Sequence, residues 1–386
     1  MSFASKIRQL NSISRAGDWR LSFIPFIIGC VYLWLYYFDI AFSGDALLLF
    51  ILSLITSFGF AALGYFINEF FDKESDRKAG KINKLAFLKP QYQYLIFLAA
   101  LSMTLLPWIK LPANHFSWNL IALELLLFLI YSLPFPRLKE IPLVSNIIDA
   151  AYAYVIPLVL AFHTYGLYAG KSFDPFILVF AVPVFFIGFR NIFIHQVNDV
   201  FKDRRSEIRT LPIVLGVAQS NYFLKILLLL EFSGVVVFSV LLSLINPLFW
   251  FWLAFYGVFF IYRFLRLLPA FFTVYFPIDK ARHLGDVLYQ IWFPLFMLAF
   301  LLNSDWRWFF IIPVHFLILT PHYIFKPILQ FCKKAYYTVV VLVSVHFRHL
   351  ISMCVNYPIY YMFLLFGVNL IREKKSAMEY LKEKWS

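Results

Sequence analysis

The sequence predicts an all-α protein that crosses a membrane many times. Of its 386 residues, 62% are hydrophobic and only 14% are charged, and the mean hydropathy is +0.77. Soluble domains are more polar than this. The apolar residues gather in runs that are long enough, or nearly so, to cross about 30 Å of hydrocarbon as helices. We therefore expect a bundle of membrane-spanning helices.

The apolar runs place the predicted spans in order along the chain. They cover residues 20–38, 46–71, 92–109, 116–135, 145–168, 174–199, 221–245, 247–268, 284–303 and 306–325, and a further apolar stretch covers 335–370. No small-residue cleavage site follows the first run, so we expect it to be retained as a helix rather than removed as a signal peptide.

Positive charge predicts the orientation. Lys6, Arg8, Arg15 and Arg20 precede the first span, whereas the next loop carries Asp39 and Asp45 and has no Lys or Arg. The positive-inside rule then places the N-terminus and the loops after spans two, four, six and eight in the cytoplasm. This topology explains most of the formal net charge of +13, so no nucleic-acid partner is expected. We expect the membrane to be a bacterial plasma membrane.

Two stretches place acidic residues directly after apolar runs, on the predicted cytoplasmic side. The first holds Asn68, Asp72 and Asp76 and continues with Arg77 and Lys78; the second holds Asp199 and Asp203 and continues with Arg204 and Arg205. Residues four apart lie on nearly the same face of a helix.

A single Asp at a helix end has ordinary explanations, such as contact with headgroup water or pairing with a neighbouring Arg. Two equally spaced pairs on one side of the membrane favour a different interpretation. Clustered carboxylates repel one another unless cations neutralise them. Mg²⁺ binds such oxygen ligands and keeps open positions for phosphate. The pattern therefore indicates a site for divalent cations and a polyphosphate.

These stretches resemble the UbiA superfamily of intramembrane prenyltransferases. Residues 68–78 look like the first Asn-x-x-x-Asp-x-x-x-Asp motif of that family, and Asn83-Lys84 falls where its downstream Asn-basic pair lies. Residues 198–212 are similar to the second aspartate motif with its Ile-Arg-Thr-Leu-Pro tail. Residues 131–139, between spans four and five, give a third match. The resemblance covers roughly residues 15–303 and implies a nine-helix core.

Two positions depart from the family pattern. Quinone-type members commonly carry an additional Asp three residues before the position of Asp199, where this chain has Gln196. A Gly that is common before the Ile-Arg-Thr tail is replaced by Glu207. Both differences concern the acceptor and the surroundings of the second motif more than the reaction class.

The resemblance implies a role for each candidate residue. Asp72, Asp76, Asp199 and Asp203 would be the catalytic acids, binding two Mg²⁺ ions that hold the diphosphate of an isoprenyl diphosphate, with Asn68 as a neutral oxygen ligand or hydrogen-bonding group. A second electrostatic layer would stabilise the departing diphosphate. Its candidates are Arg77, Lys78, Lys84, Arg137, Lys139 and Arg204.

The resemblance thus implies Mg²⁺-dependent transfer of a polyprenyl group to an aromatic or other lipid-pathway acceptor inside the membrane. Residues 1–303 would form the transmembrane prenyltransferase core, and residues 304–386 would add transmembrane segments and a basic C-terminal tail. Two alternatives stay open. One is phosphoribosyl transfer to a polyprenyl phosphate, which the quinone-like tail of the second motif disfavours. The other is a cation or proton transporter, which predicts acids near the bilayer midplane.

Overall fold

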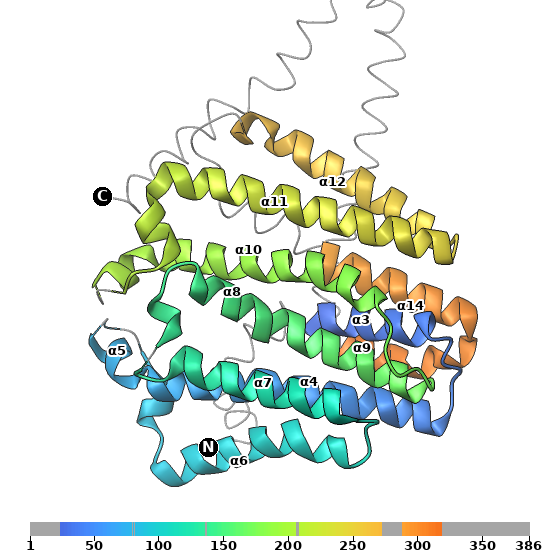
Figure 1. The fold of residues 1–386 in the computed structure, drawn as a ribbon, viewed down its shortest axis with the longest axis horizontal. Coiled ribbons are helices and arrows are strands. Elements are labelled where there is room, and N and C mark those ends of the chain that lie inside the picture. Colours follow the sequence, from blue (N-terminus) through green and yellow to red (C-terminus); the bar gives the residue numbers. More distant parts are fainter. Residues whose placement is uncertain are drawn as a thin grey trace, which may run out of the picture.

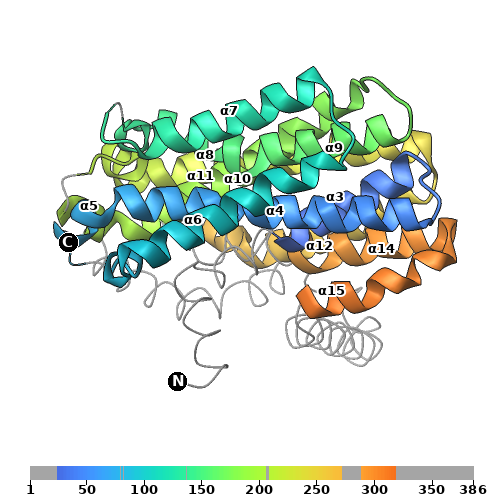
Figure 2. The same ribbon diagram turned by 90° about the horizontal axis from the view of Figure 1, so that it is seen from below.

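A computed structural model describes residues 24–78, 80, 82–135, 137–205, 208–271 and 288–318, and in these ranges the chain is helical with no β-strand. The predicted all-α class is confirmed. The long helices lie side by side along the long axis of the molecule (Figure 1). A view from below shows α14 and α15 on the opposite side of the bundle from α7 (Figure 2).

The first part of the chain holds α3 (Ile24–Tyr37), α4 (Gly44–Phe71), α5 (Lys73–Lys78), η1 (Leu85–Phe87), α6 (Pro90–Leu105), η2 (Leu106–Ile109), α7 (His115–Ser132), η3 (Leu138–Glu140), α8 (Val144–Ala150), the π-helical turn η4 (Ala151–Val155) and α9 (Ile156–Tyr168). The second part holds α10 (Phe176–Arg205), α11 (Leu211–Ile245), α12 (Phe249–Phe271), the π-helical turn η5 (Leu288–Trp292), α14 (Phe293–Ser304), η6 (Trp306–Ile311) and α15 (Ile312–Ile318).

Each predicted span coincides with a helix or with consecutive helices. Six of the described segments are long and apolar enough to cross a membrane, and three shorter apolar helices accompany them. Two boundaries differ from the prediction. The helix α10 continues to Arg205, so the second motif is helical. The helix α11 begins at Leu211 rather than near residue 221, because Pro212 favours a first helical turn, which a kink at Gly216 (φ 72°, ψ 178°) separates from the rest of the helix. The stretch 335–370 and the basic tail lie outside the described residues.

The helix α3 is the centre of the bundle. Its residues from Ile24 to Leu35 are all buried, and its apolar character on every face allows neighbouring helices to pack all around it. The neighbours that cover it include α14, α9, α4 and α15. Tyr32 of α3 stacks on His315 of α15, with ring centroids 5.8 Å apart. The described part of the predicted C-terminal extension therefore packs directly on the core.

Close contact between α4 and α6 depends on Gly59. A Cβ atom at this position would lie 2.4 Å from the backbone nitrogen of Thr104 and 2.6 Å from the carbonyl carbon of Met103. Backbone atoms cannot rotate out of the way, so any side chain at position 59 must push the two helices apart. Small residues at helix crossings in membranes commonly permit this approach.

A buried ion pair joins α10 to α11. Arg190 Nε donates to Glu231 Oε2 at 2.5 Å, and the two side chains are 0% and 5% exposed. Around it lie Tyr256 of α12 and Tyr289 of η5, whose hydroxyl oxygens are 3.4 Å apart. A charge inside a membrane bundle is stable only when an opposite charge and hydrogen bonds compensate its lost hydration. The pair therefore fixes α10, which carries the second motif, against its neighbours.

Gly59→Ala should lower the thermal unfolding temperature of the detergent-solubilised protein, because overpacking of a close contact costs about 1–3 kcal/mol. Gly257→Ala is the matched control, since a Cβ atom on this helical glycine meets nothing within 4 Å. Equal or higher stability of Gly59→Ala would show that α4 and α6 do not approach this closely.

Glu231→Ala should destabilise the protein by about 3 kcal/mol, because it leaves the Arg190 charge buried without its carboxylate. Arg307→Ala breaks an exposed pair with Asp305, in which Arg307 is 52% exposed, and should cost less than about 1 kcal/mol. Chemical denaturation of both variants measures the difference. Similar losses in the two variants would contradict the assigned burial of the α10–α11 pair.

Candidate functional site

The first motif lies where α4 ends. Asp72 is the C-terminal cap of α4, and its backbone N–H donates to the Asn68 carbonyl at 3.0 Å. The Asp76 N–H donates in turn to the Asp72 carbonyl at 2.8 Å. These bonds continue the helical i→i−4 pattern into α5. Asn68, Asp72 and Asp76 therefore follow one helical path, as their spacing predicts.

Two cations from the segment between α7 and α8 hold Asp72. Arg137 Nη2 lies 3.2 Å from Asp72 Oδ1 and donates to Ser75 Oγ at 3.0 Å. The Lys139 ammonium forms an ion pair with the same carboxylate and lies 3.3 Å from Asn68 Oδ1. The side chains of Arg137, Lys139 and Asp72 are only 19%, 11% and 15% exposed. The third predicted match, residues 131–139, is thus brought onto the first motif.

Burial and charge act in opposite directions on Lys139. Loss of hydration lowers its pKa below the usual lysine value, and the Asp72 carboxylate opposes this shift. Arg137 adopts a left-handed backbone conformation, with φ 47°, which is uncommon for a residue other than glycine. Both features indicate that the local structure places these two cations against Asp72 at an energetic cost.

Asn83 holds the Asp76 carboxylate. Its Nδ2 donates to Asp76 Oδ2 at 3.0 Å and to the Glu69 carbonyl at 2.8 Å, while its Oδ1 accepts from the Ala86 N–H at 3.1 Å. The Asn83 residue is 5% exposed, and Lys84 beside it is exposed. The Asn-basic pair therefore contributes a buried amide that orients the motif.

The second motif forms the last turns of α10. Asp199 Oδ2 lies 3.7 Å from His195 Nε2, one helical turn earlier, and the Asp199 side chain is 20% exposed. Asp203 is buried, at 6% exposed, and its carbonyl accepts from the Ile208 N–H at 2.9 Å. Arg204 is exposed. Glu207 lies outside the described residues.

Tyr131 lies near both motifs. It is within electrostatic range of Asp72 of the first motif, of Asp203 of the second, and of Asp149 of α8. The ends of α4 and α10 also lie at the same end of the bundle, on the left in Figures 1 and 2. Within the described residues, no set of three or more His, Cys, Asp or Glu side chains surrounds a single metal position. The acids are instead divided between two elements that flank Tyr131.

Two predicted cations of the first motif lie on the outer surface of α5. Arg77 pairs with Glu74 at 2.7 Å, and its side chain is 77% exposed. Lys78 is also exposed. The structure therefore separates the predicted cations into a partly buried pair, Arg137 and Lys139, and an exposed group formed by Arg77, Lys78, Lys84 and Arg204.

The sequence did not predict a polar cluster that lies on α8, η4 and α10, further inside the bundle than the helix ends that carry the motifs. Tyr152 of η4 donates to Asp149 Oδ2 at 2.6 Å, and Gln196 Nε2 of α10 donates to Ser145 Oγ at 3.2 Å. Asn191 Nδ2 donates to the Tyr154 hydroxyl at 2.7 Å. Only the Gln196 position drew attention in the sequence. The other contacts give no signal there: Asn191 and Tyr154 are 37 residues apart, and the local pair of Asp149 and Tyr152 has no distinctive pattern.

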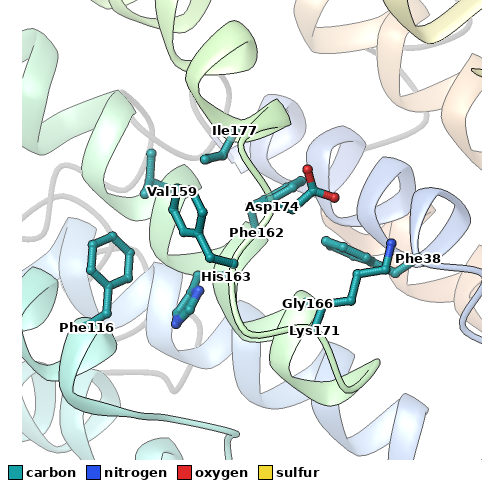
Figure 3. Close-up of a pocket in the computed structure, with 10 residues that line it drawn as sticks. Phe38, Phe116, Val159, Phe162, His163, Gly166, Lys171, Asp174 and Ile177 are labelled. Carbon is teal, nitrogen blue, oxygen red and sulfur yellow. The ribbon is translucent and has the colours of Figure 1, made fainter.

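A small cavity lies at the opposite end of the bundle from the motifs. Figure 3 shows its lining side chains, which come from the residue after α3, the start of α7, α9, the connection between α9 and α10, and the start of α10: Phe38, Phe116, Val159, Phe162, His163, Gly166, Lys171, Phe173, Asp174 and Ile177. Its polar groups have protein partners, since His163 Nε2 lies 3.0 Å from Asn114 Oδ1 and Tyr37 donates to Asp174 at 3.0 Å. It contains none of the motif residues.

Solved structures share this fold. A UbiA homologue from Archaeoglobus fulgidus, bound to DMAPP and Mg²⁺, aligns with a TM-score of 0.51 and 16% identity over 75% of this chain and 98% of its own. An apo UbiA homologue from Aeropyrum pernix K1 aligns with a TM-score of 0.53 and 13% identity, over 73% of this chain and 97% of its own. A digeranylgeranylglyceryl phosphate synthase aligns with a TM-score of 0.51 and 18% sequence identity, over 78% of this chain and 99% of its own. No curated protein sequence matches this chain.

Structural similarity at such low sequence identity shows the fold alone, whereas a match to a family model assigns the chain to a family. The model describes the UbiA prenyltransferase family and matches residues 22–270, which is more than half of the chain. The apolar helices and this match together identify an integral membrane protein. The family predicted from the three motifs is confirmed: the chain belongs to the UbiA prenyltransferase family.

Proposed function

We propose that this protein transfers a polyprenyl group from an isoprenyl diphosphate to an aromatic or other lipid-pathway acceptor within the membrane, with Mg²⁺ as its cofactor. The observation that carries the proposal is that α4 and α10, the helices that carry the two aspartate motifs, end at the same end of the bundle (Figures 1 and 2), with Tyr131 within electrostatic range of Asp72 and Asp203. Structures similar to this one contain DMAPP with Mg²⁺ and GPP with Mg²⁺.

The donor set suits magnesium. Asn68, Asp72, Asp76, Asp199 and Asp203 offer the hard oxygen ligands that Mg²⁺ prefers. Their division between α4–α5 and α10 suits two ions that share one diphosphate better than a single ion held by one group of acids. Bound Mg²⁺ would neutralise charge on the departing diphosphate.

The buried cations supply the next layer of the site. Lys139 and Arg137 are the groups best placed to bind diphosphate oxygens, because both already lie against Asp72 with little exposure to water. A cation in such surroundings stabilises a developing negative charge more strongly than one in bulk water does. Arg77, Lys78, Lys84 and Arg204 would form an outer, exposed layer that attracts the anionic substrate.

The position of the acids favours transfer over transport. Asp72 caps α4, Asp76 lies in α5 and Asp203 lies in the last turn of α10, so these acids lie at helix ends rather than at mid-span. We also propose that this end of the bundle faces the cytoplasm of a bacterium, following the positive-inside distribution. The division into a core at 1–303 and an extension at 304–386 belongs to the same proposal.

Asp72→Asn and Asp203→Asn should each abolish Mg²⁺-dependent release of pyrophosphate from geranylgeranyl or farnesyl diphosphate, because each removes a ligand and a charge from the diphosphate site. The assay uses protein in lipid nanodiscs with a panel of acceptors, and thermal unfolding verifies the fold. Asp45→Asn is the control, since Asp45 is exposed in the first turn of α4, at the other end of that helix.

Wild-type activity in both motif variants would contradict the proposal. Release of pyrophosphate from phosphoribosyl diphosphate with a polyprenyl phosphate acceptor, and none from isoprenyl diphosphates, would favour phosphoribosyl transfer. Cation-dependent currents in liposomes without either reaction would favour a transporter.

Lys139→Ala should raise the KM for the isoprenyl diphosphate by about tenfold to a hundredfold, as expected for the loss of a charge-assisted hydrogen bond. Arg77→Ala should have a smaller effect, because this side chain is mostly exposed and already pairs with Glu74. Lys110→Ala, an exposed change at the end of η2, should leave the KM unchanged. A larger effect from Arg77 than from Lys139 would reverse the assigned order of the two layers.

A further inference from the structure

Asp149 is an acid that the proposed diphosphate site does not use. It lies on α8, next to Ala150 and one turn after Asn146, both of which are 0% exposed. The Asp149 side chain itself keeps partial exposure. Its Oδ2 accepts a hydrogen bond from the Tyr152 hydroxyl at 2.6 Å, which leaves Oδ1 and a second lone pair on Oδ2 available to another donor.

Asp149 lies beside the motifs but deeper in the bundle. The rings of Tyr131 and Tyr152 lie edge to face with their centroids 5.3 Å apart, and Tyr131 is within electrostatic range of Asp149, Asp72 and Asp203. Asp149 follows Val144, the first residue of α8, by about 7 Å of helical rise. It therefore lies between the acids at the helix ends and the hydrocarbon that an isoprenyl tail requires.

The backbone around Asp149 is specialised. The π-helical turn Ala151–Val155 follows it directly, and such turns are frequent at functional sites. The helix α10 approaches this turn closely, because Gly188 has no side chain and a Cβ atom there would lie 2.7 Å from the Tyr154 ring and 3.1 Å from the Ala150 Cα. Together, these contacts hold α8 and η4, which carry Asp149 and Tyr152, between α7 and α10 (Figure 1).

Two buried amide groups where α8 meets α10 have a hydrogen-bonding atom without a partner among the described residues, one on α8 and one that donates to Ser145 of α8. Asn146 Nδ2 and Gln196 Oε1 have no hydrogen-bond partner among the described residues, although the residues are 0% and 6% exposed. Asn146 and Asp149 are three residues apart and so lie on neighbouring positions of one helix face. An unsatisfied buried polar atom costs about 1–3 kcal/mol, and a polar ligand at this position removes that cost.

We propose that Asp149, with Tyr152 and Tyr131, forms the binding position for a hydroxyl group of the prenyl acceptor, and that Asp149 accepts the proton of that hydroxyl. This inference rests on the proposed prenyl transfer. For an alcohol, a lone pair of the hydroxyl oxygen forms the new bond to C1 of the isoprenyl group. For a phenol, the ring carbon ortho to the hydroxyl forms this bond, and its hydrogen then moves to the phenolate oxygen and restores the aromatic ring. The C1–O bond to the diphosphate breaks, and its electron pair leaves with the diphosphate. The hydroxyl proton moves to the Asp149 carboxylate.

The inference names a substrate class. A carboxylate is a strong acceptor of hydrogen bonds from neutral hydroxyl groups, and it repels an acceptor that presents an anionic group at the same position. The reacting part of the acceptor is therefore a hydroxyl compound, either a phenol or an alcohol. Gln196, which replaces the acid of quinone-type relatives, keeps the neighbouring position on α10 neutral.

The test compares Asp149→Asn with wild-type protein in nanodiscs. The hydroxyl probes are 4-hydroxybenzoate, 1,4-dihydroxy-2-naphthoate and a 1-alkylglycerol phosphate, each supplied with geranylgeranyl diphosphate and Mg²⁺. Transfer to the probe that the wild type uses best should fall by about a hundredfold or more, in the range of general base catalysis. Binding of farnesyl thiolodiphosphate and slow pyrophosphate release without acceptor should stay within about twofold of wild type.

Asp174→Asn is the matched control. Asp174 accepts a hydrogen bond from Tyr37 at 3.0 Å, as Asp149 does from Tyr152, but at the other end of the bundle. This variant should transfer prenyl groups at the wild-type rate. Unchanged binding of the thiolodiphosphate to Asp149→Asn also shows that the variant is folded.

Three results would overturn the inference. Asp149→Asn could retain more than half of the wild-type transfer rate, the O-methyl ethers of the probes could be prenylated as fast as the hydroxyl compounds, or the wild type could release pyrophosphate while prenylating none of the hydroxyl probes. If the wild type neither binds the thiolodiphosphate nor releases pyrophosphate, this result contradicts the proposed prenyl transfer itself. The inference about Asp149, which rests on that function, is then also wrong.

Discussion

Neutralisation of Asp72 at the edge of the apolar bundle is the constraint on which the site depends. A carboxylate with 15% exposure requires compensating charge, and the compensation comes from Arg137 and Lys139, 65 and 67 residues further along the chain. The pairing ties the end of α4 to the segment between α7 and α8. It also concentrates cations where the proposed function needs to receive a diphosphate.

The bundle makes this arrangement rigid. The buried helix α3 is enclosed by its neighbours, Gly59 brings α4 into contact with α6, and the Arg190–Glu231 pair joins α10 to α11. These features act on α4 and α10, which are the helices that end in the two motifs. Electrostatic stabilisation of a leaving group requires both sets of acids to have fixed positions, because preorganised charges need no rearrangement during the reaction.

Hydropathy was sufficient to predict the all-α class and the place of each span, because exclusion of backbone polar groups from lipid leaves few alternatives. The helical path of Asn68, Asp72 and Asp76 also followed from spacing alone. Helix starts were harder to predict: Pro212 favours a first turn at Leu211, and a kink at Gly216 separates this turn from the long helix, whereas hydropathy detects only the later apolar run. The sequence analysis placed Arg77 and Lys139 in one group of diphosphate-binding cations. In the structure they differ, because the Arg77 side chain is mostly exposed and the Lys139 side chain is mostly buried.

Long-range polar contacts were the main features of the structure that could not be predicted from the sequence. Nothing in the local pattern indicates that Tyr152 and Asp149 lie beside Tyr131, that Asn191 meets Tyr154, or that Arg190 pairs with Glu231. Each contact joins elements whose order in space depends on the packing of the whole bundle. A π-helical turn such as Ala151–Val155 likewise has no distinctive composition. These are the contacts from which the acceptor position is inferred.

A double-mutant cycle for donor binding tests most directly whether the two motifs act on one diphosphate. Calorimetry with farnesyl thiolodiphosphate and Mg²⁺ would compare wild type, Asp72→Asn, Asp203→Asn and the double variant. Residues that share a ligand couple by about 0.5–3 kcal/mol, so the double variant should bind more tightly than the two single losses predict. Additive losses, within about 0.3 kcal/mol, would show that Asp72 and Asp203 act independently and would contradict a common site.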